Sequence, residues 1–230
     1  MLAMDTSSRV CTVALGGASG LLGEFSLGVD RAHSRWLHPA IARLLGDTGI
    51  NGDDITAVAV SVGPGSFTGL RIGVACAKAL AYAWGVPVIP VPTLDVLARA
   101  AGPAAGLVSP VVVARRGEVY AGLYRCGQRV EGPLAEEEEA WLGHLRSLQE
   151  DVLVLGDALD RKDAPLRERL GPGLTAAPPS MCLPRAAIVA ELGWELMAKG
   201  VVTHAFSATP LYLKKAQAEI VWERNRGREV

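Results

Sequence analysis

Residues 55–84 read ITAVAVSVGPGSFTGLRIGVACAKALAYAW, and this stretch decides the fold. Ile55 to Val62 is a short run of β-branched residues and alanine, which is typical of a buried strand. A glycine-rich turn from Gly63 to Gly69 follows, and the small-residue segment from Leu70 to Trp84 has the composition of a helix. The order of strand, glycine turn and helix predicts an α/β protein.

The segments on either side of this stretch complete the first half of the chain. Apolar residues at helical spacing predict an amphipathic helix from His33 to Leu45. Thr93 is the expected N-cap of a further helix that runs to about Ala101. Short apolar or alternating runs between turn residues predict strands, the first three of them antiparallel, at Leu2–Met4, Val10–Leu15, Leu21–Leu27 and Pro87–Val91.

The second half repeats this order. A hairpin signal, Arg115-Arg116-Gly117, joins the first two strands, and four consecutive glutamates favour the positive end of a helix from Glu136 to Leu148. Tyr212 lies in a final short extended piece. The other expected elements are strands at Leu107–Ala114, Glu118–Tyr124, Gln128–Leu134 and Val152–Leu155 and a helix at Arg185–Ala198.

Both halves therefore read as three strands, a helix, a strand and a helix, which is the pattern of a duplicated α/β unit. We divide the chain into an N-terminal half (1–102), a C-terminal half (103–213) and a tail (214–230). The tail mixes Lys and Arg with glutamates, which favours a solvated segment over one that contacts phosphates weakly.

One helix carries a stripe of small residues. Gly69, Gly73, Ala77 and Ala81 recur every four residues, so another element can approach its backbone closely. An internal contact explains the stripe, and so does a dimer or partner interface built with the His33–Leu45 helix. The interface hypothesis assigns Trp36, Leu37, Ile41, Leu45, Gly69, Ile72, Gly73, Cys76 and Ala77 to that surface.

The glycine turn is a candidate anion site. Backbone amides converge at the start of a helix, and Ser66 or Thr68 is the expected cap. The turn matches neither a Walker A loop nor G-x-G-x-x-G, so a purely structural turn is the competing interpretation. The DTSS turn after the first strand is a weaker candidate. Together the two turns give the candidate phosphate contacts Asp5, Thr6, Gly65, Ser66, Thr68 and Arg71.

Composition narrows the class of protein. The formal net charge is -1, from 23 Lys and Arg against 24 Asp and Glu, which disfavours tight RNA binding by the chain alone. Four scattered cysteines predict neither a zinc site nor a disulfide framework. The spacing of His33 and His38 does not suit a shared metal, and core or capping roles are expected for them. The sequence shows no signal peptide and no membrane span, so we expect a cytoplasmic protein.

Several motifs resemble one family. They are MDTS at Met4–Ser7, H-S-x-x-L at His33–Leu37, GPGSFTGLRIG at Gly63–Gly73, RRGEVY at Arg115–Tyr120 and PLYL at Pro210–Leu213. Together they resemble the TsaB (YeaZ) family over essentially the whole chain and in the same order. The glycine segment is highly specific at that length.

The resemblance implies an actin-like, ribonuclease H-like (ASKHA) fold with two subdomains. It also implies a role in placing threonylcarbamoyl on the adenosine beside the anticodon of tRNAs that read ANN codons. TsaB-type proteins are regarded as inactive paralogues that pair with the catalytic subunit TsaD, with the ATPase TsaE as third member. The donor comes from a separate synthase. The implied partners are therefore TsaD, TsaE and, for the free protein, a second copy, with tRNA contacted only through the complex.

Departures from the family pattern support the inactive interpretation. TsaD-like catalysts carry a metal-binding histidine pair, whereas here Trp36 and Leu37 follow His33 without a closely spaced second histidine. Val113 stands where the family usually has Asp before Ala-Arg, and Lys214 replaces the usual Arg after PLYL. No metal and no required cofactor are expected, and ATP or ADP would bind only weakly.

The leading hypothesis is a non-catalytic subunit that docks on TsaD through the two helices and organises it. An ATP-dependent phosphotransferase or ATPase is the alternative, because the fold, Asp5 and the glycine turn fit it. A metallopeptidase, long attached to the wider family by name, ranks far behind because metal ligands are missing from the sequence.

Overall fold

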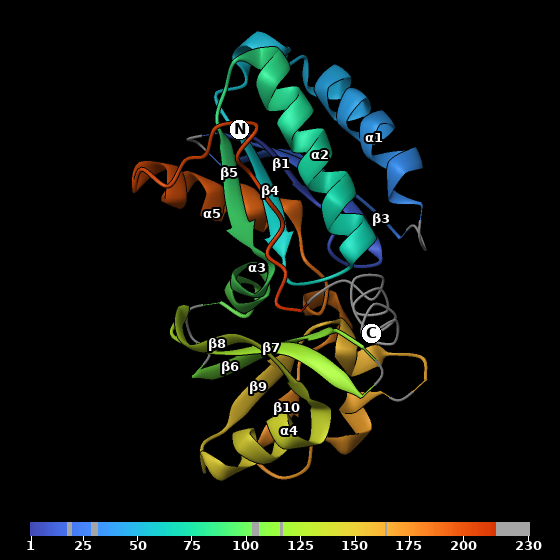
Figure 1. Cartoon of the computed structure of the whole chain (residues 1–230), viewed down its shortest axis with the longest axis vertical. Coiled ribbons are helices and arrows are strands. Elements are labelled where there is room, and N and C mark those ends of the chain that lie inside the picture. Colours follow the sequence, from blue (N-terminus) through green and yellow to red (C-terminus); the bar gives the residue numbers. More distant parts are fainter. Residues whose placement is uncertain (18–19, 29–31, 103–105, 116, 164, 215–230) are drawn as a thin grey trace, which may run out of the picture.

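The computed structural model describes residues 1–17, 20–28, 32–102, 106–115, 117–163 and 165–214. Two five-stranded mixed sheets form the two halves, one above the other in Figure 1. Their strand orders are β3-β2-β1-β4-β5 and β10-β9-β6-β7-β8. The central strands β1 and β6 each pair antiparallel with the next strand along the chain and parallel with β4 and β9, respectively. The predicted duplication is therefore confirmed in the topology.

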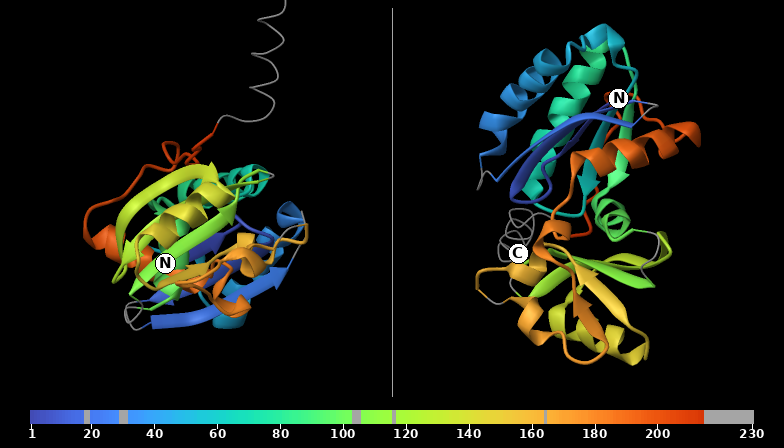
Figure 2. Two further views of the ribbon diagram at one scale, coloured as in Figure 1. Left: turned by 90° about the horizontal axis from the view of Figure 1, so that it is seen from below. Right: turned by 180° about the vertical axis from the view of Figure 1, so that it is seen from behind.

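The N-terminal half is a sheet covered by helices on both faces. Helices α1 and α2 lie side by side on one face, and α5 crosses the other (Figures 1 and 2). Buried apolar residues form a separate core on each face. The elements are β1 (Leu2–Asp5), β2 (Val10–Gly17), β3 (Gly20–Gly28), α1 (His33–Thr48), η1 (Gly52–Asp54), β4 (Val58–Gly63), α2 (Phe67–Trp84), β5 (Val88–Pro92) and α3 (Thr93–Ala100).

The C-terminal half is built around Trp141 and Tyr124, the largest fully buried side chains of the structure. The Trp141 indole donates to the Ser109 hydroxyl at 3.0 Å. The elements of the C-terminal half are β6 (Leu107–Val113), β7 (Glu118–Arg125), β8 (Gln128–Glu137), α4 (Glu138–Ser147), β9 (Val152–Leu155), η2 (Asp157–Asp160), η3 (Leu166–Arg169), β10 (Leu174–Ala176) and η4 (Pro179–Met181), and α5 (Ala186–Ala198) follows them in the chain.

Chain order and spatial grouping differ at the C-terminal end. Helix α5 follows the second half in sequence but packs on β1 and β2 of the first sheet. Thr203 then forms two backbone hydrogen bonds with Val88 on the edge strand β5. The amide of each residue donates to the carbonyl of the other at 2.9 Å. The Leu211 amide donates to the Val62 carbonyl at 2.7 Å. Residues 186–211 thus complete the N-terminal half.

Several predicted boundaries were wrong for local reasons. Glu136 and Glu137 pair with β7 as part of β8, so only the last two of the four glutamates begin α4. Thr93 is the first residue of α3 instead of its cap, and its hydroxyl has no partner among the described residues. The short strand β10 was not predicted. Of the predicted tail, residues 215–230 lie outside the described residues.

Candidate functional site

A cavity of about 600 Å³ lies between the two halves, where the central strands of both sheets end. The first half contributes the turn after β1, the start of α1 and the start of α2. The second half contributes the end of β6 and the start of η2. The lining residues are Ser7, Ser8, Arg9, His33, Ser66, Thr68, Gly69, Ile72, Val112, Val113, Ala114 and Asp157.

The turn after β1 is fixed by its own hydrogen bonds. Asp5 is fully buried and accepts from the Ser7 amide at 2.9 Å and from the Ser7 hydroxyl at 3.0 Å. Burial raises the pKa of the Asp5 carboxyl, and the bonds from Ser7 oppose that shift. The Thr6 hydroxyl, also buried, donates to the Gly69 carbonyl at 2.8 Å. Both side chains therefore stabilise the turn and do not line the cavity.

Helix α2 begins at the cavity wall. Ser66 is its N-cap, as predicted, and the Ser66 hydroxyl accepts from the Gly69 amide at 3.2 Å. The Ser66 amide donates to the Ser7 carbonyl at 2.7 Å, which ties this turn to the turn after β1. The approach is so close that a Cβ on Gly65 would lie 2.5 Å from the Ser7 carbonyl oxygen. Glycine is required here by packing between two backbone segments.

Of the six predicted phosphate contacts, Ser66 and Thr68 line the cavity. Gly65 allows the start of α2 to pack closely against the turn after β1. The side chains of Asp5 and Thr6 are already engaged in hydrogen bonds to Ser7 and Gly69. Arg71 is exposed and points elsewhere, because its guanidinium stacks over the Phe67 ring and donates to the Tyr212 hydroxyl at 3.1 Å. The assignment of Arg71 to the cavity is not supported, since that side chain follows the outer face of α2.

Asp157 is a cavity residue that sequence reasoning missed. Its carboxylate accepts from the Val113 amide at 2.9 Å, which places an acidic group beside the position where the family pattern has Asp and this chain has valine. Burial raises the pKa of Asp157, while the Val113 amide and the nearby Arg9 oppose that shift. A signal was present, because Gly156 and Asp157 come directly after a buried strand, as the glycine turn does at the end of β4.

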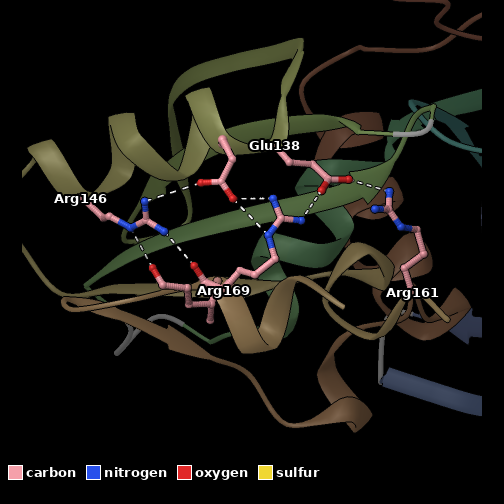
Figure 3. A network of polar contacts seen from close by, with 6 residues as sticks. Glu138, Arg146, Arg161 and Arg169 are labelled. Atoms are coloured by element: carbon pink, nitrogen blue, oxygen red, sulfur yellow. Dashed lines mark hydrogen bonds and ion pairs between the residues drawn. The ribbon is translucent and has the colours of Figure 1, made fainter. Parts of the chain in front are cut away.

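A network of charged groups anchors the segment that carries Asp157. Glu138, almost fully buried at the start of α4, accepts from Arg161 at 2.6 Å and from Arg169 at 2.8 Å (Figure 3). Arg146 donates to the carbonyls of Arg169 and Leu170 at 2.7 and 3.0 Å. The chain after η2 is thereby held against α4.

His33 begins α1 and also lines the cavity. The side chain is buried, as the predicted core role requires, and its Nδ1 atom has no hydrogen-bond partner among the described residues. Burial lowers the pKa of His33 below its ordinary value, and a hydrogen bond with the Ser8 backbone opposes that shift. His38 is exposed, and its Nε2 atom lies 3.7 Å from the Cys76 sulfur.

Most of the residues predicted at a partner surface are buried within the chain. Only Trp36 is exposed, and Leu45 and Ile72 are half-buried. The fully enclosed members are Leu37, Ile41, Gly69, Gly73, Cys76 and Ala77.

The glycine stripe faces the protein's own sheet. A Cβ on Gly73 would lie 2.3 Å from the Thr6 hydroxyl oxygen, so this stripe packs α2 against β1. The prediction that it is open to another chain is therefore corrected. The outward-facing residues of α2 are Arg71, Ala75, Ala79 and Ala83. Tyr82, beside Ala83, is also exposed, at 66%.

Comparisons with known proteins agree with this architecture. A tRNA threonylcarbamoyladenosine biosynthesis protein TsaB from Bacillus subtilis is 32% identical over 226 residues, covering 96% of this chain and 97% of the relative. The Escherichia coli protein of the same name is 30% identical over 239 residues, covering 100% and 99%. This chain belongs to the TsaB family. Residues 27–144 also match the family model described as "TsaD: tRNA N6-adenosine threonylcarbamoyltransferase".

Two solved structures have the same fold as this TsaB family member. A Pseudomonas aeruginosa protein with similarity to peptidase YEAZ superposes with a TM-score of 0.79 at 29% identity, covering 93% of this chain and 98% of that one. YeaZ from the same organism gives 0.75 at 28% identity, covering 92% and 98%. With the duplicated strand order, these matches confirm the expected actin-like, ribonuclease H-like fold.

Two further features of the TsaB chain concern metals and membranes. Among the described residues, no group of three His, Cys, Asp or Glu side chains is placed to hold a metal ion. Within the same part of the chain, each helix is too short or too polar to cross a bilayer.

Proposed function

We propose that this protein is the non-catalytic partner of a TsaD-type subunit in the bacterial system that forms threonylcarbamoyladenosine in tRNA. It docks on that subunit and organises it, with a TsaE-type ATPase as third member and tRNA contacted through the assembly. Full-length similarity to two TsaB proteins supports the pathway. The match to the TsaD family model includes α1 and α2 and supports a paralogue of the catalytic subunit.

The observation that carries the docking proposal is the outward face of the α1–α2 layer. Ala75 and Ala79 are exposed and carry only small apolar side chains, so a partner helix can approach the backbone of α2 there. Trp36 on α1 and Tyr82 at the end of α2 present large exposed side chains of the kind that anchor interfaces. We call Trp36, Ala75, Ala79 and Tyr82 the docking face.

A pairing experiment tests the docking face. Ala79→Arg places a long charged side chain on exposed helix surface, so the chain still folds while a closely packed interface is blocked. The matched control is Ala140→Arg, because Ala140 is an exposed alanine on α4 in the other half. Titrating both variants onto purified TsaD should show lost affinity for Ala79→Arg alone. Equal affinity for the two variants would sink the assignment of this face.

The same face accounts for the homodimer expected of the free protein. A two-fold pairing would use one patch on both copies, so both self-association and TsaD binding would depend on Ala79. Sedimentation of Ala79→Arg without TsaD should therefore show a monomer wherever the unmodified chain dimerises.

The ATP-dependent phosphotransferase or ATPase is kept as a second candidate because one observation favours it. The cavity between the halves places the hydroxyl-bearing residues Ser66 and Thr68 at the start of α2, opposite Asp157. ATP hydrolysis by the isolated chain would support this candidate. A rate indistinguishable from that without protein would exclude it.

A further inference from the structure

Strand β3 is an edge strand with little protection against pairing. It is nine residues long and hydrogen-bonds to β2 on one side, and among the described residues no backbone group bonds to its other side. It contains no proline, lysine or arginine. Its one charged side chain, Glu24, is 11% exposed, because it pairs with Arg185 and accepts from the Ala187 amide at 3.0 Å. Backbone amides and carbonyls are therefore open along this edge.

Each of the other three sheet edges is protected by a different feature. β10 is only three residues long. β5 carries Pro90 and Pro92, and Thr203 pairs with its outer side at Val88. β8 carries Pro133 and four charged residues. Short strands, prolines and charges are the features that keep an edge from pairing with another chain. Because β3 has none of the three, we interpret its open edge as a binding feature.

A bulge exposes two leucines at the start of β3. The register with β2 shifts beside Gly23, so that Leu22 has no partner residue on β2. Leu21 and Leu22 are 51% and 54% exposed. Beyond the bulge, the register is regular from Gly23 to Gly28. Bulges often stand next to functional sites because they re-aim a side chain, and here a regular edge follows directly after two exposed apolar groups.

A pocket of about 660 Å³ adjoins these leucines between the β2–β3 hairpin and α5. The Trp194 indole lines it, and its Nε1 atom is buried without a hydrogen-bond partner among the described residues. An unpaired buried donor calls for an explanation, and a carbonyl of a bound segment would supply one. The hairpin contributes Gly16, Gly17, Gly20 and Leu21, and α5 contributes Ile188 and Trp194. These walls are suited to an aliphatic side chain.

The charges at the pocket indicate the sign of its occupant. Glu191 and Glu195 both line the pocket and share the single guanidinium of Arg99. Arg185 lines it too, but this residue is paired with Glu24. The charged groups of the pocket and their ion-pair partners are thus three carboxylates against two guanidinium groups. A cationic side chain on the occupant would complement the carboxylate in excess.

We propose that the open edge of β3 binds an extended segment of a partner protein by strand addition. The backbone of the segment pairs with β3, an aliphatic side chain enters the pocket, and a lysine or arginine lies beside Glu191 or Glu195. One strand edge and one pocket offer far less area than the roughly 1,600 Å² of a standard interface, so a peptide segment fits better than a second folded domain. The site is separate from the docking face, and the proposal does not depend on TsaD binding.

Amide and indole signals of the ¹⁵N-labelled full chain test the proposal. The probe is the capped peptide Lys-Thr-Leu-Thr-Leu-Thr-Lys, and a second peptide has glutamate in place of both lysines. We expect saturable shifts in β3 and in the Trp194 indole with the lysine peptide, and at least about tenfold weaker binding of the glutamate peptide. No saturable shift in β3 with the lysine peptide in the millimolar range would overturn the site.

A third peptide separates strand pairing from simple insertion into the pocket. It has the sequence of the lysine peptide with every internal amide N-methylated, so it cannot donate backbone hydrogen bonds to β3. We expect it to lose binding. Binding as tight as that of the unmethylated peptide would mean that the backbone does not pair, and the proposal would fail.

Variants of the chain locate the peptide. Leu22→Lys puts on the edge the side chain that natural edge strands use against pairing, so affinity should fall at least about tenfold. Val130→Lys is the matched control, because Val130 is 59% exposed on the edge strand β8. It should bind within about twofold of the unmodified chain. Equal losses in the two variants would mean a general charge effect and would overturn the site.

Glu191→Gln tests the charge complementarity. Glu191 is 55% exposed, so the change should leave the fold intact while reducing the preference for the lysine peptide over the glutamate peptide. An unchanged preference would contradict the placement of the cation.

Hydrogen exchange of the chain without peptide identifies other occupants of the edge. An open edge predicts fast exchange for the outward-facing amides between Gly23 and Gly28, at every protein concentration. Slow exchange that rises with concentration would identify a second copy as the occupant. Slow exchange that does not depend on concentration would identify a segment of the same chain. Either result would overturn the assignment to a partner segment.

Discussion

The Thr6 hydroxyl donates to the Gly69 carbonyl at 2.8 Å, and a Cβ on Gly69 would lie 2.0 Å from the Thr6 carbonyl oxygen. This contact joins the end of β1 to the first turn of α2. It explains why glycine occupies the start of the inward stripe, because any side chain would separate the helix from the sheet. It also fixes the position of the helix end at the cavity.

Gly69→Ala should therefore destabilise the protein. The backbone atoms it meets cannot rotate away, so we expect a loss of about 3 kcal/mol in the free energy of unfolding. Gly46→Ala is the control, since Gly46 lies in α1 with nothing within 4 Å of its missing Cβ. That change should be neutral or stabilising by up to about 1 kcal/mol. Urea denaturation measures both, and equal stability of the two variants would contradict the packing described.

Two neighbouring glutamates should differ sharply in their effect on stability. Glu138 is 3% exposed and pairs with Arg169 and with Arg161, which is only 16% exposed, so Glu138→Ala leaves the Arg161 guanidinium mostly buried without its carboxylate partner and should cost about 3 kcal/mol. Glu139 is 60% exposed and forms ion pairs with Arg169 and Arg146 near the surface, so Glu139→Ala should cost less than about 1 kcal/mol. Thermal unfolding of the two variants compares them directly. A larger loss for Glu139→Ala would show that the network of Figure 3 is wrongly described.

His33 should make stability fall in mild acid. Burial lowers its pKa below the ordinary value of 6.5, so below that pH the unfolded chain takes up a proton before the folded chain does. Stability is then lost as pH falls from about 6.5 towards the folded pKa, by at most about 1.4 kcal/mol per pH unit. Asp5 and Asp157, whose pKa values are raised, act in the opposite direction.

A comparison with His33→Gln isolates this contribution from the carboxylates. Urea unfolding at two pH values, one above and one below 6.5, should give a smaller loss of stability for the variant than for the unmodified chain. An identical pH dependence in the two proteins would mean that His33 is not kept neutral by the fold.

The fold was largely predictable, because its strands and long helices carry strong local patterns. The run from Ile55 to Val62 and the glycine turn after it identified strand β4, the turn and helix α2 directly. Strand β10 was missed because Leu174–Ala176 is too short for a period to appear. The packing of α5 on the first sheet could not be predicted from the sequence either, because the apolar residues of a helix do not specify which of two sheets it covers.

The candidate site was predicted only in part, for two physical reasons. Helix α2 carries small residues on both faces, and the spacing alone does not say whether Gly73 or Ala75 faces the sheet. Contact with Thr6 decides the question. Asp157 and His33 lie far apart in sequence and line the same cavity only because the two halves close around it. No local motif announces such a pairing.

The central claim, a partner subunit that acts through TsaD, is tested most directly by reconstituted tRNA modification. Purified TsaD, TsaE, the donor synthase, ATP and tRNA are combined without this chain, with the unmodified chain, and with Ala79→Arg. We predict modified adenosine only with the unmodified chain, and neither modification nor ATP hydrolysis by the chain alone. Equal product in all three mixtures would contradict the account, because TsaD would then need neither this protein nor its docking face.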